Sequence, residues 1–233
     1  MKIHQKSGII LLVITSLWSE ASLAGVVVGG TRVVYNGGKR EASLSVRNPD
    51  QNPYLIQTWA DANGPSGETK SAQQPPFVVT PPVFRLDAGK ENMVRIIRTG
   101  GDLPEDRESI YWMNIKSIPA SSKNDKNVLQ ISVKTRIKLI YRPEGVHAPT
   151  EDDYRQVSFH RAGNQIQIIN PTSYYLSFFS LNIGHTPVTA SIMVPPKDRA
   201  SYPMPSAASG SQVTWRAIND FGGNSQDIVS SLQ

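Results

Sequence analysis

The chain has 233 residues, 18% of them charged, with a formal net charge of +5. It has no cysteine, which excludes disulfides and thiolate metal sites and leaves packed core as the source of stability. A positive net charge favours acidic or carboxylate-bearing partners. It also permits nucleic-acid binding, but only in a compartment that contains nucleic acid.

The first 24 residues have the organisation of a secretory signal peptide. Lys2 and Lys6 precede the short apolar run 9–14, and small residues stand at the end of the segment, before a cleavage site after Ala24. The run is too short to cross a bilayer, and no other segment is long and apolar enough. The pattern predicts export from the cytoplasm.

Short β segments separated by turn signals follow. The expected strands are 26–35, 42–46, 54–59, 77–79, 83–86, 92–98 and 109–115, with no segment of helical period of useful length among them. Asn36-Gly37 predicts a two-residue hairpin, since both positions tolerate positive φ. About seven strands at this spacing are typical of an immunoglobulin-like β-sandwich.

The segment 127–142 alternates most regularly and is expected to form one long strand. It runs for about sixteen residues, whereas strands usually have about five or six. Part of it could therefore be an edge that pairs with another chain. The alternative is a long sandwich strand with a solvated cationic face. Apolar residues on one parity are Leu129, Ile131, Val133, Ile137, Leu139 and Tyr141, and the cations on the other are Lys134, Arg136, Lys138 and Arg142.

Pro143-Glu144-Gly145 interrupts the chain after this strand. Further short strands are expected at 157–160, 165–169, 174–181, 192–194, 200–202 and 213–218. The sequence thus predicts an all-β protein with two immunoglobulin-like sandwiches, residues 25–145 and 146–233, which meet at an angle across an interdomain cleft.

Signatures of catalysis are absent from the sequence. There is no HExxH, no GxSxG and no phosphate-binding glycine loop, and His147, His160 and His185 are scattered. We therefore expect no catalytic residue, no metal site and no cofactor. Considered singly, Arg32 and Lys138 are most simply surface cations.

One segment carries a specific resemblance. Residues 103–120, LPEDRESIYWMNIKSIPA, resemble the signature segment of the periplasmic pilus chaperones of the chaperone–usher pathway. The resemblance covers essentially the whole mature chain in order. Supporting motifs are Asn48-Pro49, 53–59 (PYLIQTW), 81–86 (PPVFRL), 138–143 (KLIYRP), 170–175 (NPTSYY) and 218–223 (INDFGG).

The resemblance implies a fold, a function and a set of site residues. It implies two immunoglobulin-like domains in an L shape, a periplasmic location, and a chaperone that binds, folds and caps pilus subunits by donor-strand complementation before delivery to the outer-membrane usher. The residue roles it implies are an anchor for the C-terminal carboxylate of a pilus subunit at Arg32 and Lys138, a donor strand with Leu129, Ile131 and Val133, and an interdomain salt bridge of Glu108, Arg142 and Asp220. The residues alone would not single out the last three.

Finer expectations follow from the same resemblance. The short spacing between Pro119 and Leu129 is similar to the short-loop class, which serves rod-like pili. Some relatives close the second domain with a disulfide, so the end of this chain, 228–233, is expected to be short or frayed. The exposed apolar row makes a self-capping dimer a further hypothesis.

Other functions stay open at this point. A secreted immunoglobulin-like adhesin or structural pilin is the main alternative, and a periplasmic enzyme with an unrecognised site is another. A nucleic-acid binder fits the cations but not the compartment. No membrane span is expected in the mature protein.

Overall fold

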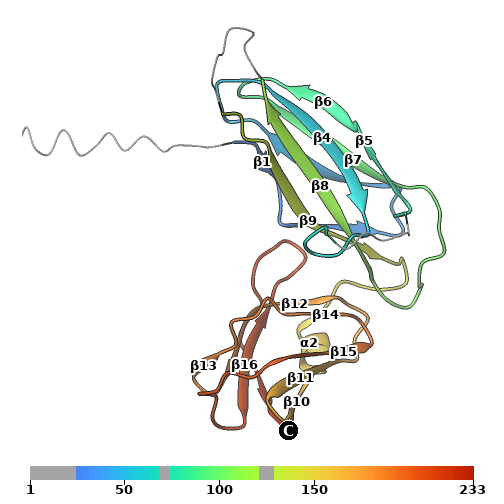
Figure 1. The fold of residues 1–233 in the computed structure, drawn as a ribbon. Helices are drawn as coiled ribbons and strands as arrows, with labels where there is room; N and C mark the ends of the chain where they lie inside the picture. The colour runs from blue at the N-terminus through green and yellow to red at the C-terminus, as the bar shows by residue number, and fades with distance from the viewer. Residues whose placement is uncertain (1–24, 69–73, 121–128) are drawn as a thin grey trace, which may run out of the picture.

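The structure, a computed structural model, describes residues 25–68, 74–120 and 129–233. The expected signal peptide 1–24 and the first two residues of the expected long strand, 127 and 128, lie outside the described residues. Two β-sandwiches lie end to end at an angle and are joined through the segment after β9 (Figure 1). The predicted all-β fold with two immunoglobulin-like domains in an L is confirmed.

The first sandwich consists of two sheets whose inward-facing side chains form one core. All its neighbouring strands are antiparallel except β2 and β9, which are parallel. One sheet has the order β1 (Val27–Val28), β3 (Glu41–Arg47), β7 (Glu91–Arg98), β5 (Phe77–Thr80). The other has the order β2 (Arg32–Asn36), β9 (Val133–Arg142), β8 (Ser109–Pro119), β4 (Tyr54–Asp61), β6 (Val83–Leu86).

The second sandwich has its own core, centred on Trp215, Phe178 and Phe159. The Trp215 ring lies 4.8 Å from that of Phe178 and 5.8 Å from that of Phe159. One sheet has the order β10 (Ser158–Ala162), β11 (Gln165–Asn170), β15 (Asp198–Pro203). The other has the order β13 (Thr186–Pro187), β12 (Leu176–Ile183), β16 (Gln212–Ala217), β17 (Ile228–Ser231), and β14 (Met193–Val194) also pairs with β12.

The long strand is shorter than the sequence predicts. β9 begins at Val133, which is paired with Ser117 of β8, and the described residues 129–132 belong to no strand. The pairing of β9 with β8 stops at Ser117, although β8 continues for two residues to Pro119 and pairs there with β4. Alternation alone extended the prediction past the last residue of β9 that pairs with β8.

The hairpin expected at Asn36-Gly37 is wrong as a strand pairing, although the chain does turn there. The Lys39 amide donates to the Asn36 carbonyl at 2.9 Å. The two strands that the turn joins lie in different sheets, because β2 pairs with β9 and β3 pairs with β1 and β7. Turn chemistry is local and does not determine which strands pair.

Two features near the ends of the second sandwich were missed or misjudged. A short helix, α2 (Glu151–Arg155), begins with a capping box between Thr150 and Asp153, and five residues are too few to show helical period. The last strand, β17, is short at four residues, but the end of the chain is not frayed. Gln233 exchanges two backbone hydrogen bonds with the first strand of this sandwich, 2.9 Å to Phe159 and 2.7 Å from Arg161.

Removal of the central aromatic should destabilise the second sandwich selectively. Trp215 is fully buried, so Trp215→Ala should lower the free energy of unfolding by about 3–5 kcal/mol. Urea unfolding measures the loss. Val229→Ala on the neighbouring strand β17 is the control: this side chain is 61% exposed, and we expect a change within about 0.5 kcal/mol. Equal losses in the two variants would contradict the assigned core.

Candidate functional site: a cation pair beside a free strand edge

The parallel pairing of β2 with β9 creates an open strand edge. It sets Arg32 opposite Lys138 and continues to Asn36 opposite Arg142. Before Arg32 the chain crosses to the other sheet, where the Gly29 amide donates to the Ser45 carbonyl at 2.9 Å. Along residues 133–137, β9 therefore has β8 on one side and no described strand on the other.

The apolar row predicted from the sequence leads into this open edge. Leu129 is 83% exposed, Ile131 66% and Val133 53%, although these are large apolar side chains. The same parity continues into Ile137 and Leu139, which are buried in the core of the first sandwich. The apolar alternation thus runs out of the folded core into solvent, and the exposed part has no covering element among the described residues.

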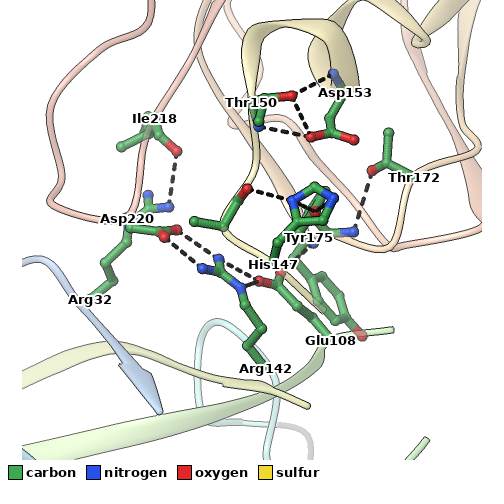
Figure 2. Close-up of polar contacts among 12 residues, drawn as sticks. Arg32, Glu108, Arg142, His147, Thr150, Asp153, Thr172, Tyr175, Ile218 and Asp220 are labelled. Atoms are coloured by element: carbon green, nitrogen blue, oxygen red, sulfur yellow. Dashed lines mark hydrogen bonds and ion pairs between the residues drawn. The ribbon is translucent and has the colours of Figure 1, made fainter. Parts of the chain in front are cut away.

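The predicted cation pair lies where the open edge ends. The Lys138 ammonium donates to Ser177 Oγ at 2.6 Å, and Arg32 Nη1 donates to the Ile218 carbonyl at 3.2 Å. Both acceptors belong to the second sandwich, and Figure 2 shows the Arg32 contact. Within the described chain neither cation forms a salt bridge, and the buried Nε of Arg32 has no hydrogen-bond partner. The pair therefore retains donor capacity for an anion.

Burial disfavours the charged forms of Lys138 and Arg32 and lowers the pKa of both side chains. Desolvation, helped by the positive charge of Arg32, lowers the pKa of Lys138 to about 8. Desolvation also lowers the pKa of Arg32, against the attraction of Asp220. A carboxylate bound between the two side chains would offset both effects and would hold Lys138 protonated.

The structure also brings together Glu108, Arg142 and Asp220, the three residues of the predicted interdomain network (Figure 2). Arg142 makes a forked contact with Asp220 at 2.7 and 2.8 Å, and its Nη2 lies 2.7 Å from Glu108 Oε1. Glu108 Oε2 accepts a hydrogen bond from the Tyr175 amide at 2.7 Å. The Arg142 guanidinium thus joins Glu108 of the first sandwich to Asp220 of the second, and Glu108 itself contacts a second segment of that sandwich at Tyr175.

The carboxylate and the guanidinium of this network are deeply buried. The side chain of Glu108 is 2% exposed and that of Arg142 7%. Burial raises the pKa of Glu108 in spite of the neighbouring guanidinium. Burial also opposes the charge of Arg142, but hydrogen bonds to Asp220 and the charge of Glu108 outweigh it and raise the pKa of the guanidinium. Removing one partner would leave an uncompensated buried charge.

A second buried ion pair was not found from the sequence. Arg136 makes a forked contact with Asp61 at 2.8 and 2.6 Å, and it donates to Asn114 Oδ1 at 2.6 Å and to the Gly64 carbonyl at 2.6 Å. Its guanidinium also lies 5.1 Å from the centre of the Trp112 ring. Asp61 had no visible signal because it lies 75 residues from Arg136 in the chain.

These contacts exclude the solvated cationic face that the sequence left open. Of the cations on the outward parity of β9, Arg136 and Arg142 are held in largely buried ion pairs and Lys138 is partly buried. Among these four cations, Lys134 alone is exposed.

The remaining features of the described residues do not suggest catalysis. A pocket of about 440 Å³ lies between the sandwiches, lined among others by Arg107, Tyr111 and Tyr175. No group of three or more His, Cys, Asp or Glu side chains in the described ranges could hold a metal ion. No helix within those ranges has the length and hydropathy needed to cross a membrane.

An immunoglobulin-like fold with an open strand edge beside partly buried cations could take up an extended strand of another chain. Comparisons with known proteins identify the family. Residues 25–147 match the PapD N-terminal domain of pili and flagellar-assembly chaperones, and residues 152–228 match the PapD C-terminal domain of pili assembly chaperones. The probable fimbrial chaperone LpfB of Escherichia coli O157:H7 is 38% identical over 232 residues, covering 97% of each chain. The chaperone protein FimC of E. coli K12 is 40% identical over 217 residues, covering 91% of this chain and 87% of the relative.

Solved structures that align with this chain are also chaperones. The SafB chaperone of Salmonella enterica, in complex with the SafA pilin, aligns with a TM-score of 0.80 at 36% identity and covers 91% of this chain and 99% of that one. The E. coli chaperone DraB aligns with a TM-score of 0.78 at 37% identity, and the alignment covers 90% of this chain and 97% of DraB. The chain belongs to the PapD-like family of pilus-assembly chaperones. It is a chaperone and not an enzyme, and the adhesin and structural-pilin alternative is wrong.

The buried Asp61–Arg136 pair should make stability depend on pH. Burial opposes ionisation of Asp61, but hydrogen bonds from Arg136 and the Asn63 amide lower its pKa from 3.8 to about 2. Because the folded-state pKa is depressed, the stabilisation is present above pH 4 and is lost as pH falls toward 2. Asp61→Asn should cost about 2 kcal/mol at pH 7, and the difference from wild type should shrink through this range.

Urea unfolding at a series of pH values tests this expectation. Asp87→Asn is the matched control, since its partner Arg85 is exposed and the pair should contribute less than about 1 kcal/mol. A pH-independent difference between wild type and Asp61→Asn would show that the carboxylate charge is not what stabilises the site.

Proposed function

We propose that this chaperone binds pilus subunits in the periplasm by pairing the open edge of β9 with a strand of the subunit. The observation that carries the proposal is the arrangement of that edge: an exposed apolar row precedes it, and two partly buried cations that form no salt bridge with any described carboxylate end it. The similarity of this chain to a chaperone solved with a pilin supports the proposal.

The open edge offers what a subunit with a missing strand would need. Between residues 133 and 137, β9 presents unpaired backbone groups, and a strand laid along it exchanges main-chain hydrogen bonds. Leu129, Ile131 and Val133 would fill the apolar groove of the subunit as its donor strand. Burying one such side chain contributes about 1.5–3 kcal/mol before ordering costs.

Arg32 and Lys138 would anchor the C-terminal carboxylate of the subunit. A strand that follows the line of β2 in the parallel direction reaches the cation pair with its C-terminal end. A carboxylate there would accept charge-assisted hydrogen bonds, each contributing about 1.5–3 kcal/mol. Anchoring one end also sets the register, since a slip of one residue turns every side chain to the opposite face.

The Glu108, Arg142 and Asp220 network would hold the two sandwiches at the angle that keeps Ser177 and Ile218 over the cations. The forked contact of Arg142 with Asp220 and the backbone contact of Glu108 with Tyr175 support this role. The proposed domain boundary between residues 145 and 146 falls in the connection between β9 and α2. Delivery to the outer-membrane usher, the short-loop class and a self-capping dimer are carried over from the family resemblance as parts of the same proposal.

Substitutions at the two ends of the edge test the proposal. We expect Lys138→Ala and Ile131→Glu each to weaken binding of co-expressed pilus subunits at least tenfold, through loss of the anchor and of an apolar contact respectively. Copurification of subunits from the periplasm, with bound proteins identified by mass, measures the effect. Val78→Glu is the control, because Val78 is equally apolar and 51% exposed but lies on β5 of the other sheet.

Each outcome bears on a separate part of the proposal. If Ile131→Glu binds normally, the strand does not form the contact. If only Lys138→Ala binds normally, the strand contact stands and the carboxylate anchor is wrong. If wild type binds no co-expressed pilin, the proposed function itself is wrong.

Binding should also depend on pH through Lys138. Its pKa of about 8 in the free protein should rise when a carboxylate binds, so the affinity should fall as pH increases above 8, by up to tenfold per unit. Fluorescence titration with a strand peptide between pH 6.5 and 9.5 measures this. The amidated peptide lacks the carboxylate and should bind more weakly with a nearly flat profile. Parallel profiles for the two peptides would contradict the anchor.

A further inference from the structure

The cations on the outward face of β9 divide into two pairs. Arg136 is neutralised by Asp61, and Arg142 by Glu108 and Asp220. Lys134 and Lys138 have no carboxylate within salt-bridge distance among the described residues. Lys138 has a proposed ligand, the terminal carboxylate of the subunit. Lys134 likewise has no carboxylate within salt-bridge distance among the described residues, and it has no assigned role.

Lys134 also lies directly opposite another lysine. It is the register partner of Lys116 on β8, next to the pair formed by Asn114 and Arg136. Like charges placed opposite one another across antiparallel strands are destabilising. Lys134 is exposed and Lys116 partly buried, and no described carboxylate forms a salt bridge with either. The two ammonium groups therefore concentrate positive charge on one face of the sheet.

This charge lies beside the open edge. Lys134 is within residues 133–137, where β9 has no described neighbour on the β2 side. A strand added there would lie about 4.8 Å from β9, and every second side chain would point to the face that carries Lys134. One of those side chains would stand next to the lysine pair at the distance of a cross-strand contact.

We propose that Lys134 and Lys116 form a second anionic anchor, which takes an Asp or Glu side chain on the outward face of the subunit strand. The inference rests on the proposed function. Lys134 is four residues from Lys138, about 13 Å along the strand, so the acidic residue belongs about four residues before the terminal carboxylate. The anchor would favour subunits with that residue and would reinforce the register set by Arg32 and Lys138.

Lysines on an edge strand can also serve only to prevent aggregation. That role predicts weak attraction for any negative charge, independent of its position in the bound strand. The anchor predicts one preferred position. The two roles are therefore separated by moving a single charge along a peptide.

The probe is a synthetic peptide of alternating valine and threonine with a free C-terminal carboxylate. A single glutamate replaces each threonine in turn, with glutamine in the matched peptides. Dissociation constants are measured at low and at high salt for wild type, Lys134→Gln, Lys116→Gln and the control Lys90→Gln. Lys90 is exposed in the turn before β7, so its substitution changes net charge equally, away from the edge.

We expect glutamate to strengthen binding about two- to fivefold at one position, with the gain reduced at high salt. The gain should disappear in Lys134→Gln, should decrease in Lys116→Gln and should persist in Lys90→Gln. Lys134→Glu should bind a lysine-substituted peptide better than the glutamate peptide. A gain equal at all positions, or one unchanged in Lys134→Gln, would overturn the second anchor.

Lys138→Ala separates this inference from the proposed function. If Lys138→Ala weakens binding of every peptide and no glutamate position is preferred, only the second anchor fails. If wild type binds none of the peptides, the strand-binding proposal fails at this edge and the anchor fails with it.

Discussion

The parallel pairing of β2 with β9, and the point where it stops, determine the rest of the site. Because β2 joins the sheet only at Arg32, the edge of β9 is open along residues 133–137 and closed from Lys138 onward. The cations therefore stand where a strand arriving along the open edge would have to end. If β2 joined β9 several residues earlier, the open edge would be lost, and if β2 joined later, Lys138 would lie within the open edge and not at its end.

The outward face of this sheet is where the protein concentrates buried charge. Sandwich sheets usually turn such a face to water, but here the second domain and the loop after β4 cover much of it. Arg142 and Arg136 are each matched by carboxylates, which makes their burial tolerable. At Lys138 the second domain supplies only the neutral Ser177 hydroxyl, so no carboxylate offsets the desolvation and the positive charge of Arg32 that lower the pKa of Lys138 to about 8. The charge pattern thus distinguishes structural cations from those available to a ligand.

Fold class was predictable because sandwich strands and their turns leave local signals, as in 41–47, 54–61 and 91–98. Pairing was less predictable. The turn at Asn36-Gly37 was predicted correctly, but the partner of β2 is a strand about 100 residues away. The start of β9 was misplaced because alternation does not show where the pairing with β8 stops. Asp61 was missed because its partner is distant in sequence, whereas Arg32 and Lys138 were found only through the family resemblance.

If a subunit carboxylate binds Arg32 and Lys138 as proposed, it competes with the second domain for their hydrogen bonds. Ser177 and the Ile218 carbonyl accept hydrogen bonds that a carboxylate would otherwise accept, and they do so without charge. Neutral acceptors hold the two side chains in place, which lowers the entropy lost on binding, but they compete weakly with an anion. The position of the second domain would therefore pre-organise the proposed anchor. Since Arg142 and Asp220 join the same two sandwiches, domain angle and carboxylate affinity should be coupled through β9.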